Sequence, residues 1–416
     1  MVTRKPPNLT SGLSAGDFWA RPASERAATF AALRGSAPVS FHQLTDLAGR
    51  SMGRGFWAVT RHADVHYIGR TPQLFCSGHG VGLGQAPIDV LEVNASFLVM
   101  DAPRHTALRR VVSRAFTPKQ IDRLIDAITA EAARIVDEFV EHGGGEVVED
   151  LSKKLPLWTI SNMMGVPESL RDELYHAAEL QIAVQDPEFV PPGGNSAAVA
   201  IGAGKTMHRI AKELAAARRA QPADDIFSAF VHSEIDGAPL TDQMLGALFA
   251  LFATGGNDTT RTTTSHAMKL FSDNPEQWSR LVHEPLLIDG AVEEMLRCAT
   301  PVIHFRRTAT TDTELNGVPI AQGDAVVMFY ESANRDEAVF DDPARFDITR
   351  NPNPHVSFGG GGPHFCLGAS LARAQLRALF SKLAERVATI EAGEPHYLAS
   401  NFINGIKRMP VTVTRR

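Results

Sequence analysis

The sequence predicts a mainly α-helical protein with a small β portion, and three observations lead to this fold class. Apolar residues recur every three to four positions over long stretches, most clearly in residues 121–141, 207–219, 286–299 and 367–387. Strand-like segments are short, and the best of them, residues 325–329, follows the turn signal AQGD. Neither an internal repeat nor a low-complexity linker divides the chain, so we expect one domain over residues 1–416.

The bulk composition excludes several classes of protein. The chain has 21% charged residues and a formal net charge of −6, and no basic block suggests a nucleic acid partner. The N-terminus lacks an apolar signal core, and the longest apolar run, residues 244–253, is too short to span a bilayer. Cys76, Cys298 and Cys366 form neither a CxxC pair nor an even-numbered disulfide framework. We therefore expect a cytoplasmic protein with no integral membrane span.

Two long loops are predicted between the earlier elements. Residues 78–89 (GHGVGLGQAPID) and 186–196 (DPEFVPPGGNS) are rich in glycine or proline. Loops of this length in a compact protein often act as lids over a site. We therefore expect both segments to be mobile.

A long helix is predicted from Thr241, as its N-cap, to about Asp273, where an Asn-Pro pair follows. At 1.5 Å rise per residue it would cross the whole domain. Its middle, ATGGNDTTRTTT, contains two adjacent glycines that cost roughly 1 kcal/mol each relative to alanine. Gly-Gly alone fits a kink or a close helix crossing. The adjoining Asp258 and Thr259 favour a locally opened helix that holds water and passes protons.

Residues 357–380 read SFGGGGPHFCLGASLARAQLRALF, in which four glycines lead to Cys366 and then to a helix. A cysteine at a helix N-terminus faces unpaired N–H groups and the positive end of the helix dipole, and both lower the pKa of its thiol. The glycines would let the backbone approach a large flat group closely. From the residues alone, a buried free cysteine is an alternative, and so is a phosphate-binding loop, although the GK[ST] ending is absent.

These motifs resemble those of the cytochrome P450 family. The haem-binding loop of that family has the form Phe-x-x-Gly-x-His/Arg-x-Cys-x-Gly, and residues 362–368 match its second half. Phe358 lies one position further from the cysteine than the family pattern has it, as in a loop expanded by one residue. Residues 255–260 match the family's oxygen-binding groove, Ala/Gly-Gly-x-Asp/Glu-Thr-Thr. The resemblance extends from about residue 101 to the C-terminus.

The resemblance implies a cytochrome P450 fold, one large helical domain with small β-sheets that encloses haem b. Cys366 would be the thiolate ligand of the haem iron, which favours cleavage of the O–O bond. Phe358 would pack beside the haem and Gly255 would border it. The haem propionates would be bound by four residues at matching family positions, which are His105, Arg109, Arg307 and His364.

The resemblance also assigns catalytic, structural and substrate-binding residues. Thr259 would hydrogen-bond the bound dioxygen, and Asp258 would relay protons from solvent. Glu294, Arg297 and Arg350 match a structural triad that locks the core behind the cysteine. The substrate pocket is predicted to be apolar and to comprise Phe97, Leu98, Val99, Leu248, Phe252, Val302, Ile303, Phe305, Phe402 and Ile403.

We therefore predict a haem-thiolate monooxygenase that inserts one atom of O2 into a C–H bond of an apolar substrate. The glycine loop and residues 400–411 resemble those of actinobacterial enzymes that act on sterols and methyl-branched lipids. This resemblance suggests a methyl-branched lipid, fatty acid, terpenoid or steroid side chain as substrate. No flavin or iron–sulfur signature occurs in the sequence, so electrons from NAD(P)H would arrive through a ferredoxin and a ferredoxin reductase.

Two alternatives to a monooxygenase follow from the same motifs. A haem-thiolate isomerase or peroxygenase would need no delivery of two protons, and the Asp258–Thr259 pair argues against it. A non-enzymatic haem sensor would need no opened helix in the middle of the long segment.

Overall fold

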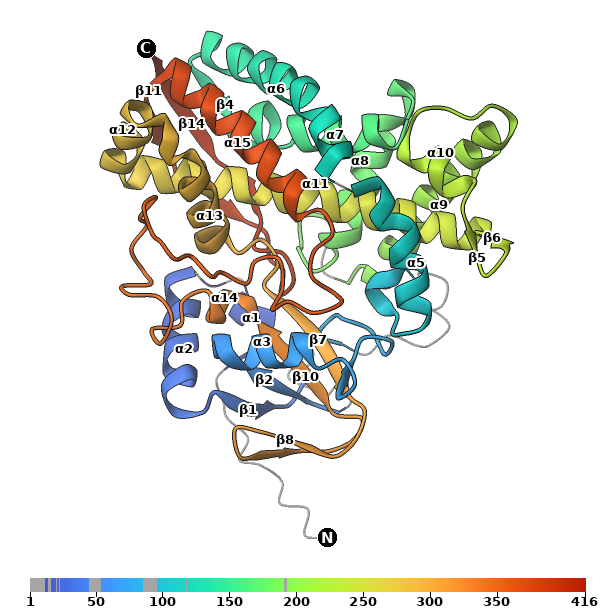
Figure 1. The fold of residues 1–416 in the computed structure, drawn as a ribbon. Helices are drawn as coiled ribbons and strands as arrows, with labels where there is room; N and C mark the ends of the chain where they lie inside the picture. Colours follow the sequence, from blue (N-terminus) through green and yellow to red (C-terminus); the bar gives the residue numbers. More distant parts are fainter. Residues whose placement is uncertain are drawn as a thin grey trace.

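The computed structural model describes residues 12–13, 16–19, 21, 23–44, 54–84, 96–116, 118–190 and 193–416. Helices dominate these parts of the chain, and most of them gather on one side of a small sheet (Figure 1). The helices are α1 (Gly16–Trp19), α2 (Ala23–Ser36), α3 (His62–Arg70), α5 (Arg104–Ser113), α6 (Pro118–Glu141), α7 (Lys154–Met163), α8 (Glu168–Ile182), α9 (Ser196–Ala220), α10 (Ile226–Val231), α11 (Asp242–Asp273), α12 (Pro275–His283), α13 (Ile288–Ala299), α14 (Tyr330–Ala333) and α15 (Ala369–Arg386).

The strands are short, as the sequence predicts. They are β1 (Val39–His42), β2 (Phe56–Val59), β3 (Phe75–Cys76), β4 (Gly144–Glu146), β5 (Glu234–Ile235), β6 (Ala238–Pro239), β7 (His304–Ala309), β8 (Thr313–Leu315), β9 (Val318–Ile320), β10 (Ala325–Phe329), β11 (Val387–Ala392), β12 (His396–Tyr397), β13 (Ile406–Arg408) and β14 (Pro410–Arg415). The main sheet has the order β1-β2-β10-β7-β3, and within it β10 runs parallel to β2.

The main sheet is apolar on both faces because alternate residues of a strand point to opposite sides. In β10, Val326 and Met328 join a cluster that includes Val65 and Ile68 of α3. Ala325, Val327 and Phe329 join a second cluster on the other face, which α1 and α2 supply with aromatic residues. The sheet is therefore covered by α3 on one face and by the N-terminal helices on the other (Figure 1).

The helix α11 runs through the centre of the helical part (Figure 1). The Thr241 side chain caps it by accepting a hydrogen bond from the backbone N–H of Met244 at 3.2 Å, and the helix ends at Asp273 as predicted. The predicted local opening does not take the form of a break, because the segment is helical throughout. Instead, Gly256 lies against Ile160 of α7, where a Cβ atom would clash with that side chain. Close helix crossing therefore explains this glycine.

The mainly α-helical fold is confirmed. The predicted segments 121–141 and 207–219 lie within α6 and α9, whereas segments 286–299 and 367–387 extend one or two residues beyond the ends of α13 and α15. Of the two predicted lids, residues 85–89 and 191–192 lie outside the described residues. Asn195 is the N-cap of α9, so the end of the second loop is an ordered helix start. Among the described helices, none is long and apolar enough to cross a membrane.

Candidate active site

The loop before Cys366 is closed by a backbone hydrogen bond. The N–H of Cys366 donates to the carbonyl of Phe358 at 2.9 Å. The Phe358 ring packs against Arg373 of α15, whose guanidinium carbon lies 4.5 Å from the ring centroid. Phe358 thus stays beside the cysteine loop even though the loop is one residue longer than the family pattern.

The glycines of this loop make a contact with α3 that was not predicted from the sequence. A Cβ atom on Gly360 would lie 2.5 Å from the carbonyl oxygen of Val65 in α3, and one on Gly362 would overlap the carbonyl of Gly69. Gly359, Gly361 and Gly362 also have positive φ angles, which L-residues rarely adopt. Gly360 and Gly362 therefore need to be glycine because the loop backbone packs directly on α3. The approach of the loop to a flat group stays a prediction.

The Cys366 thiol departs from prediction as well. The helix α15 begins at Ala369 with Gly368 as its N-cap, so the thiol lies outside the helix N-terminus. Burial raises the pKa of the thiol, while a hydrogen bond from the Gly368 backbone and the charges of Arg109 and Arg373 oppose that rise. A coordinated metal would oppose this rise, because metal binding deprotonates a thiol outright.

Gly255 and Cys366 have accessible surface although both lie in central parts of the fold. Gly255 is exposed although it lies in the middle of α11, and no atom lies within 4 Å of where its Cβ would be. Cys366 is exposed by surface area, yet surrounding protein buries its sulfur enough to raise the pKa of the thiol. Both facts fit residues that line an enclosed space and that a large ligand covers. Among the described residues, no group of three or more His, Cys, Asp or Glu side chains forms a metal site of its own.

Two cationic side chains near the cysteine loop, Arg109 and Arg307, form no ion pair with an acid among the described residues, whereas Arg373 pairs with Glu293 at 2.6 Å. Arg307 is buried, and its one described hydrogen bond goes to the neighbouring carbonyl of Arg306, at 2.8 Å. Arg109 donates to the carbonyl of Phe365. The rings of His105 and His364 lie 4.3 Å apart, and the buried Nε2 of His105 has no hydrogen-bond partner in the protein. This set of unsatisfied donors and charges fits an anionic ligand.

Two residues that hold this cluster, Ser77 and Asp101, were not predicted from the sequence. The hydroxyl of Ser77 lies 3.1 Å from Nε2 of His364. The carboxylate of Asp101 accepts the backbone N–H groups of Ser77 and Gly78 at 2.8 and 2.7 Å, which fixes the chain after β3. Asp101 lies directly before the segment that carries His105. An acidic residue at the start of a predicted helix is the sequence signal from which it could have been found. The pairing of Ser77 with His364 left no local signal in the sequence.

Asp258 and Thr259 face different partners. The Thr259 hydroxyl donates to the carbonyl of Gly255 at 2.8 Å. The Asp258 carboxylate is 1% exposed and pairs with Arg261 at 3.1 Å, and Arg261 also pairs with Glu179 of α8 at 3.0 Å. Burial raises the pKa of Asp258 to about 6, although the charge of Arg261 opposes the rise. Asp258 is thus a buried acid that can hold or release a proton near neutral pH.

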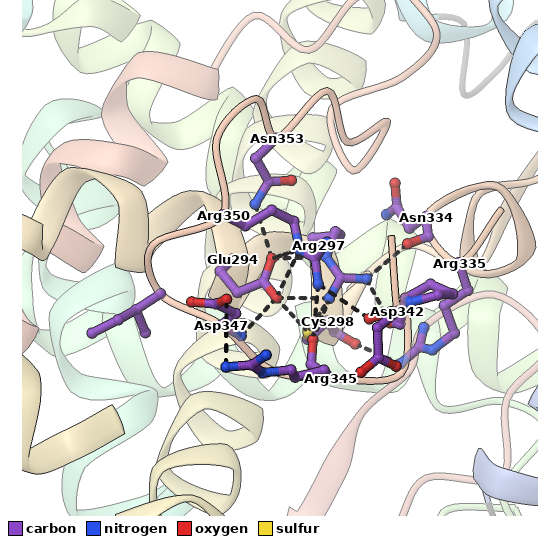
Figure 2. A network of polar contacts seen from close by, with 12 residues as sticks. Glu294, Arg297, Cys298, Asn334, Arg335, Asp342, Arg345, Asp347, Arg350 and Asn353 are labelled. Carbon is purple, nitrogen blue, oxygen red and sulfur yellow. Dashed lines mark hydrogen bonds and ion pairs between the residues drawn. The ribbon is translucent and has the colours of Figure 1, made fainter. Parts of the chain in front are cut away.

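The predicted triad is present as a buried network (Figure 2). Glu294 pairs with Arg297 at 2.7 Å, and both side chains are fully buried. Arg350 approaches the same carboxylate at 3.3 Å. Two further donors that the sequence analysis did not name, the Asn353 side chain and the Asp347 backbone, complete the hydrogen bonds of Glu294. Every lone pair of this buried acid therefore has a partner, which a buried charge requires.

The predicted pocket residues fall into two groups. Leu98, Val99, Val302, Phe305 and Phe402 keep part of their surface accessible. Phe97, Leu248, Phe252, Ile303 and Ile403 are buried within apolar clusters. Phe252 stacks between Phe116 and Phe230, with ring centroids 5.3 and 5.7 Å away. In this structure the accessible group is the one that a substrate can touch without rearrangement.

Comparisons with known proteins show the family of this chain. A family model described as Cytochrome P450 matches residues 193–388. A methyl-branched lipid omega-hydroxylase of Mycobacterium tuberculosis (strain ATCC 25618 / H37Rv) is 40% identical over 95% of this chain and 93% of its own length. The chain belongs to the cytochrome P450 family. A steroid C26-monooxygenase of Mycolicibacterium smegmatis is 38% identical over 92% of this chain and 90% of its own length.

A solved structure extends the comparison to the fold. A Mycobacterium marinum cytochrome P450 in complex with pseudoionone superposes with a TM-score of 0.94 at 47% identity, and the match covers 99% of this chain and 100% of that one. The predicted P450 fold and monooxygenase class are therefore confirmed, and the isomerase, peroxygenase and sensor alternatives receive no support. P450 membership implies a haem-thiolate centre that uses O2.

The residues of this chain fit such a haem. A single cysteine on an accessible face, a glycine with open space above it and cations without acidic partners are the features that a flat dianionic macrocycle needs. One cysteine would be sufficient to hold the iron from the protein side, because the macrocycle itself would supply nitrogen ligands.

Proposed function

We propose that this P450 hydroxylates a methyl group at or near the end of a branched aliphatic chain, carried by a lipid or a steroid. The full-length similarity to an enzyme named for omega-hydroxylation of methyl-branched lipids carries this proposal. A second relative, named for attack at steroid C26, supports the same preference for a chain terminus. Pseudoionone, which a structural neighbour binds, is itself a methyl-branched chain.

The accessible apolar residues support a long, narrow substrate. Val302 forms a bridge with Ile403, and Phe305 lies 5.5 Å from the ring of Phe402. These contacts join the strand β7 to the C-terminal segment as one apolar wall. Leu98 and Val99 would supply further apolar surface. A wall of this kind stabilises a hydrocarbon by burial and selects it by shape.

The roles of the site residues form part of the proposal. Cys366 would be the iron ligand, and His105, Arg109, Arg307 and His364 would bind the propionates. The haem, when bound, supplies the centre at which O2 is activated for insertion into a C–H bond. Thr259 would hold a proton donor beside the dioxygen, with Asp258 as the source of that proton.

The redox partners and the cellular location are also part of the proposal. The sequence shows no flavin or iron–sulfur motif, so we assign electron supply to a ferredoxin and its reductase. The three described cysteines are unpaired, which fits a cytoplasmic location. We also take the 416 residues to work as one domain, because contacts such as that of Arg26 with Glu331 join distant parts of the chain.

The decisive experiment compares matched substrates with the purified haem-loaded enzyme and a ferredoxin system. Three substrates would be tested: a long-chain fatty acid with a terminal isopropyl group, its straight-chain isomer, and a steroid with an intact side chain. For each, the haem absorption spectrum would report whether it displaces water from the iron, and product analysis would give the position of the new hydroxyl group. We expect the branched chain and the steroid to be oxidised at a terminal methyl. Oxidation only at internal or aromatic positions would refute the proposal.

A further inference from the structure

A charged pocket of about 230 Å³ opens on the side of α11 that carries Arg261. Its lining includes Glu179 and Ala183 of α8, Arg261 of α11, Lys407 of β13 and Glu149 of η3 (Val148–Ser152). The pocket is partly open to solvent and large enough for several water molecules. It is not the apolar substrate pocket, because none of the predicted substrate residues lines it.

Arg261 connects this pocket to the interior of the protein. Its side chain is 7% exposed, and its two terminal nitrogens contact different acids. Nη1 pairs with Glu179, which is 22% exposed, whereas Nη2 pairs with Asp258, which is 1% exposed. One guanidinium thus lies between a carboxylate that solvent can reach and a carboxylate that it cannot.

Two buried polar atoms at this junction lack protein partners. They are Oδ2 of Asp258 and Nε of Arg261. Buried polar groups in such positions take ordered water as their partner. Water that entered from the pocket would therefore bridge Glu179 and the free oxygen of Asp258. The hydroxyl of Tyr175, 3.0 Å from Nη1 of Arg261, borders the same passage.

We propose that this pocket is the entrance through which protons reach Asp258, with Glu179 as the acid on the solvent side and Arg261 as the residue that holds the two carboxyl groups in line. Arg261 keeps its own proton at all working pH values, so the proton moves from Glu179 to water and from water to Asp258. Each transfer breaks one O–H bond and forms another, and solvent then reprotonates Glu179. The inference rests on the proposed role of Asp258 as proton source.

The charges around Asp258 set how the pathway responds to pH. Arg261 on its own helix lowers the pKa of Asp258, and Glu179 raises it. Tyr175 of α8 and Glu149 of η3 face the same cluster. Replacing Glu179 by glutamine removes a negative neighbour, so the pKa of Asp258 is expected to fall.

The experiment uses the haem-loaded enzyme with its redox partners and three glutamate variants. Glu179→Gln should lower turnover about tenfold, since water can still bypass one missing acid, and should enlarge the solvent deuterium isotope effect without changing substrate KM. Glu179→Asp keeps an acid and should restore part of the rate. Glu188→Gln is the matched control, because Glu188 lines the same pocket but pairs with Lys407 and Arg408, and it should behave as the parent.

A second readout is independent of turnover. The protonated carboxyl band of Asp258, assigned by its loss in Asp258→Asn, would be titrated by infrared difference spectroscopy. We expect its midpoint to shift to lower pH in Glu179→Gln and to stay in place in Glu188→Gln. If Asp258→Asn slows turnover while Glu179→Gln changes neither the rate nor the band, the pathway is wrong. If Asp258→Asn itself has no effect on turnover, the proposed role of Asp258 is wrong instead.

Discussion

Burial raises the pKa of the Cys366 thiol even though Arg109 and Arg373 oppose the shift. A raised pKa reduces the share of thiolate, which is the strongly nucleophilic form of cysteine. The Gly368 backbone supplies a hydrogen bond to the sulfur, and such a bond moderates how strongly a thiolate donates to iron. The sequence motif indicated the ligand, but the net direction of its pKa depends on packing that the motif does not contain.

If Cys366 is the iron ligand, replacing it should change the haem spectrum, whereas replacing Cys76 should not. The reduced haem protein with CO should show the red-shifted band of thiolate ligation. Cys366→His should lose that band because a neutral imidazole donates less charge to the iron. Cys76→Ala should keep it, since Cys76 belongs to β3 and has no glycine loop before it. Absorption spectra of the three proteins decide the matter, and a red-shifted band that persists in Cys366→His would contradict the assignment.

The bounds of single elements were easier to predict from the sequence than the contacts between elements. The bounds of α11 followed from a capping threonine and an Asn-Pro stop, both of which are local signals. The contact of the glycine loop with α3 was not predicted because α3 lies almost 300 residues earlier, and backbone packing between distant segments leaves no local pattern. The same reason explains why Glu179 of α8 was not connected with Asp258 of α11. Resemblance, in contrast, placed the triad correctly because its spacing is a family motif.

Because the glycine loop packs on α3, adding one methyl group at Gly360 should lower the stability of the protein. Gly360→Ala should destabilise the protein by about 1–3 kcal/mol, because the Val65 carbonyl would have to move away from the new Cβ. It should also speed haem loss, since the same loop carries Cys366. Gly202→Ala in α9 is the control: no atom lies within 4 Å of its Cβ position, so it should be neutral or stabilise by roughly 1 kcal/mol. Urea denaturation of both variants measures the difference, and equal stability would contradict this explanation of the loop.

At the scale of the whole molecule, buried polar groups join segments that are far apart in sequence. Arg26 of α2 pairs with Glu331 of α14 at 3.2 Å and donates to Asn404 near the C-terminus at 2.8 Å. Asn404 in turn donates to the carbonyl of Ala299 at the end of α13. These contacts fix the N-terminal helices, the sheet end and the C-terminal segment against one another. A buried network of this kind is costly to break, because a lost partner leaves an uncompensated charge.

His304 is a buried polar group that lacks such partners among the described residues. Its ring is fully buried between Phe329 and Phe402, and neither ring nitrogen has a hydrogen-bond partner in the described part of the chain. Burial lowers the pKa of His304 to about 3 from 6.5. Between pH 6.5 and about 3 the unfolded chain therefore binds a proton at His304 that the folded chain does not bind. The free energy of unfolding is not reduced by this residue above pH 6.5, and it falls as the pH decreases toward 3. Asp258 acts in the opposite sense between pH 3.8 and about 6, because its pKa is raised on folding.

His304→Phe should therefore stabilise the protein, and more so in acid. At pH 7 the gain should be about 1–2 kcal/mol, the usual cost of burying polar atoms without partners. At pH 5 the gain should grow by about 2 kcal/mol, since each pH unit below 6.5 is worth about 1.4 kcal/mol for one histidine that cannot protonate when folded. Exposed His396→Phe in β12 serves as the control and should show no such pH-dependent gain. Denaturation curves of both haem-loaded variants at the two pH values give the answer. A gain for His304→Phe that is equal at pH 5 and pH 7 would mean that the ring finds a partner for its proton in the folded protein. The acid sensitivity would then have to come from other histidines whose pKa is lowered on folding, such as the half-buried His266.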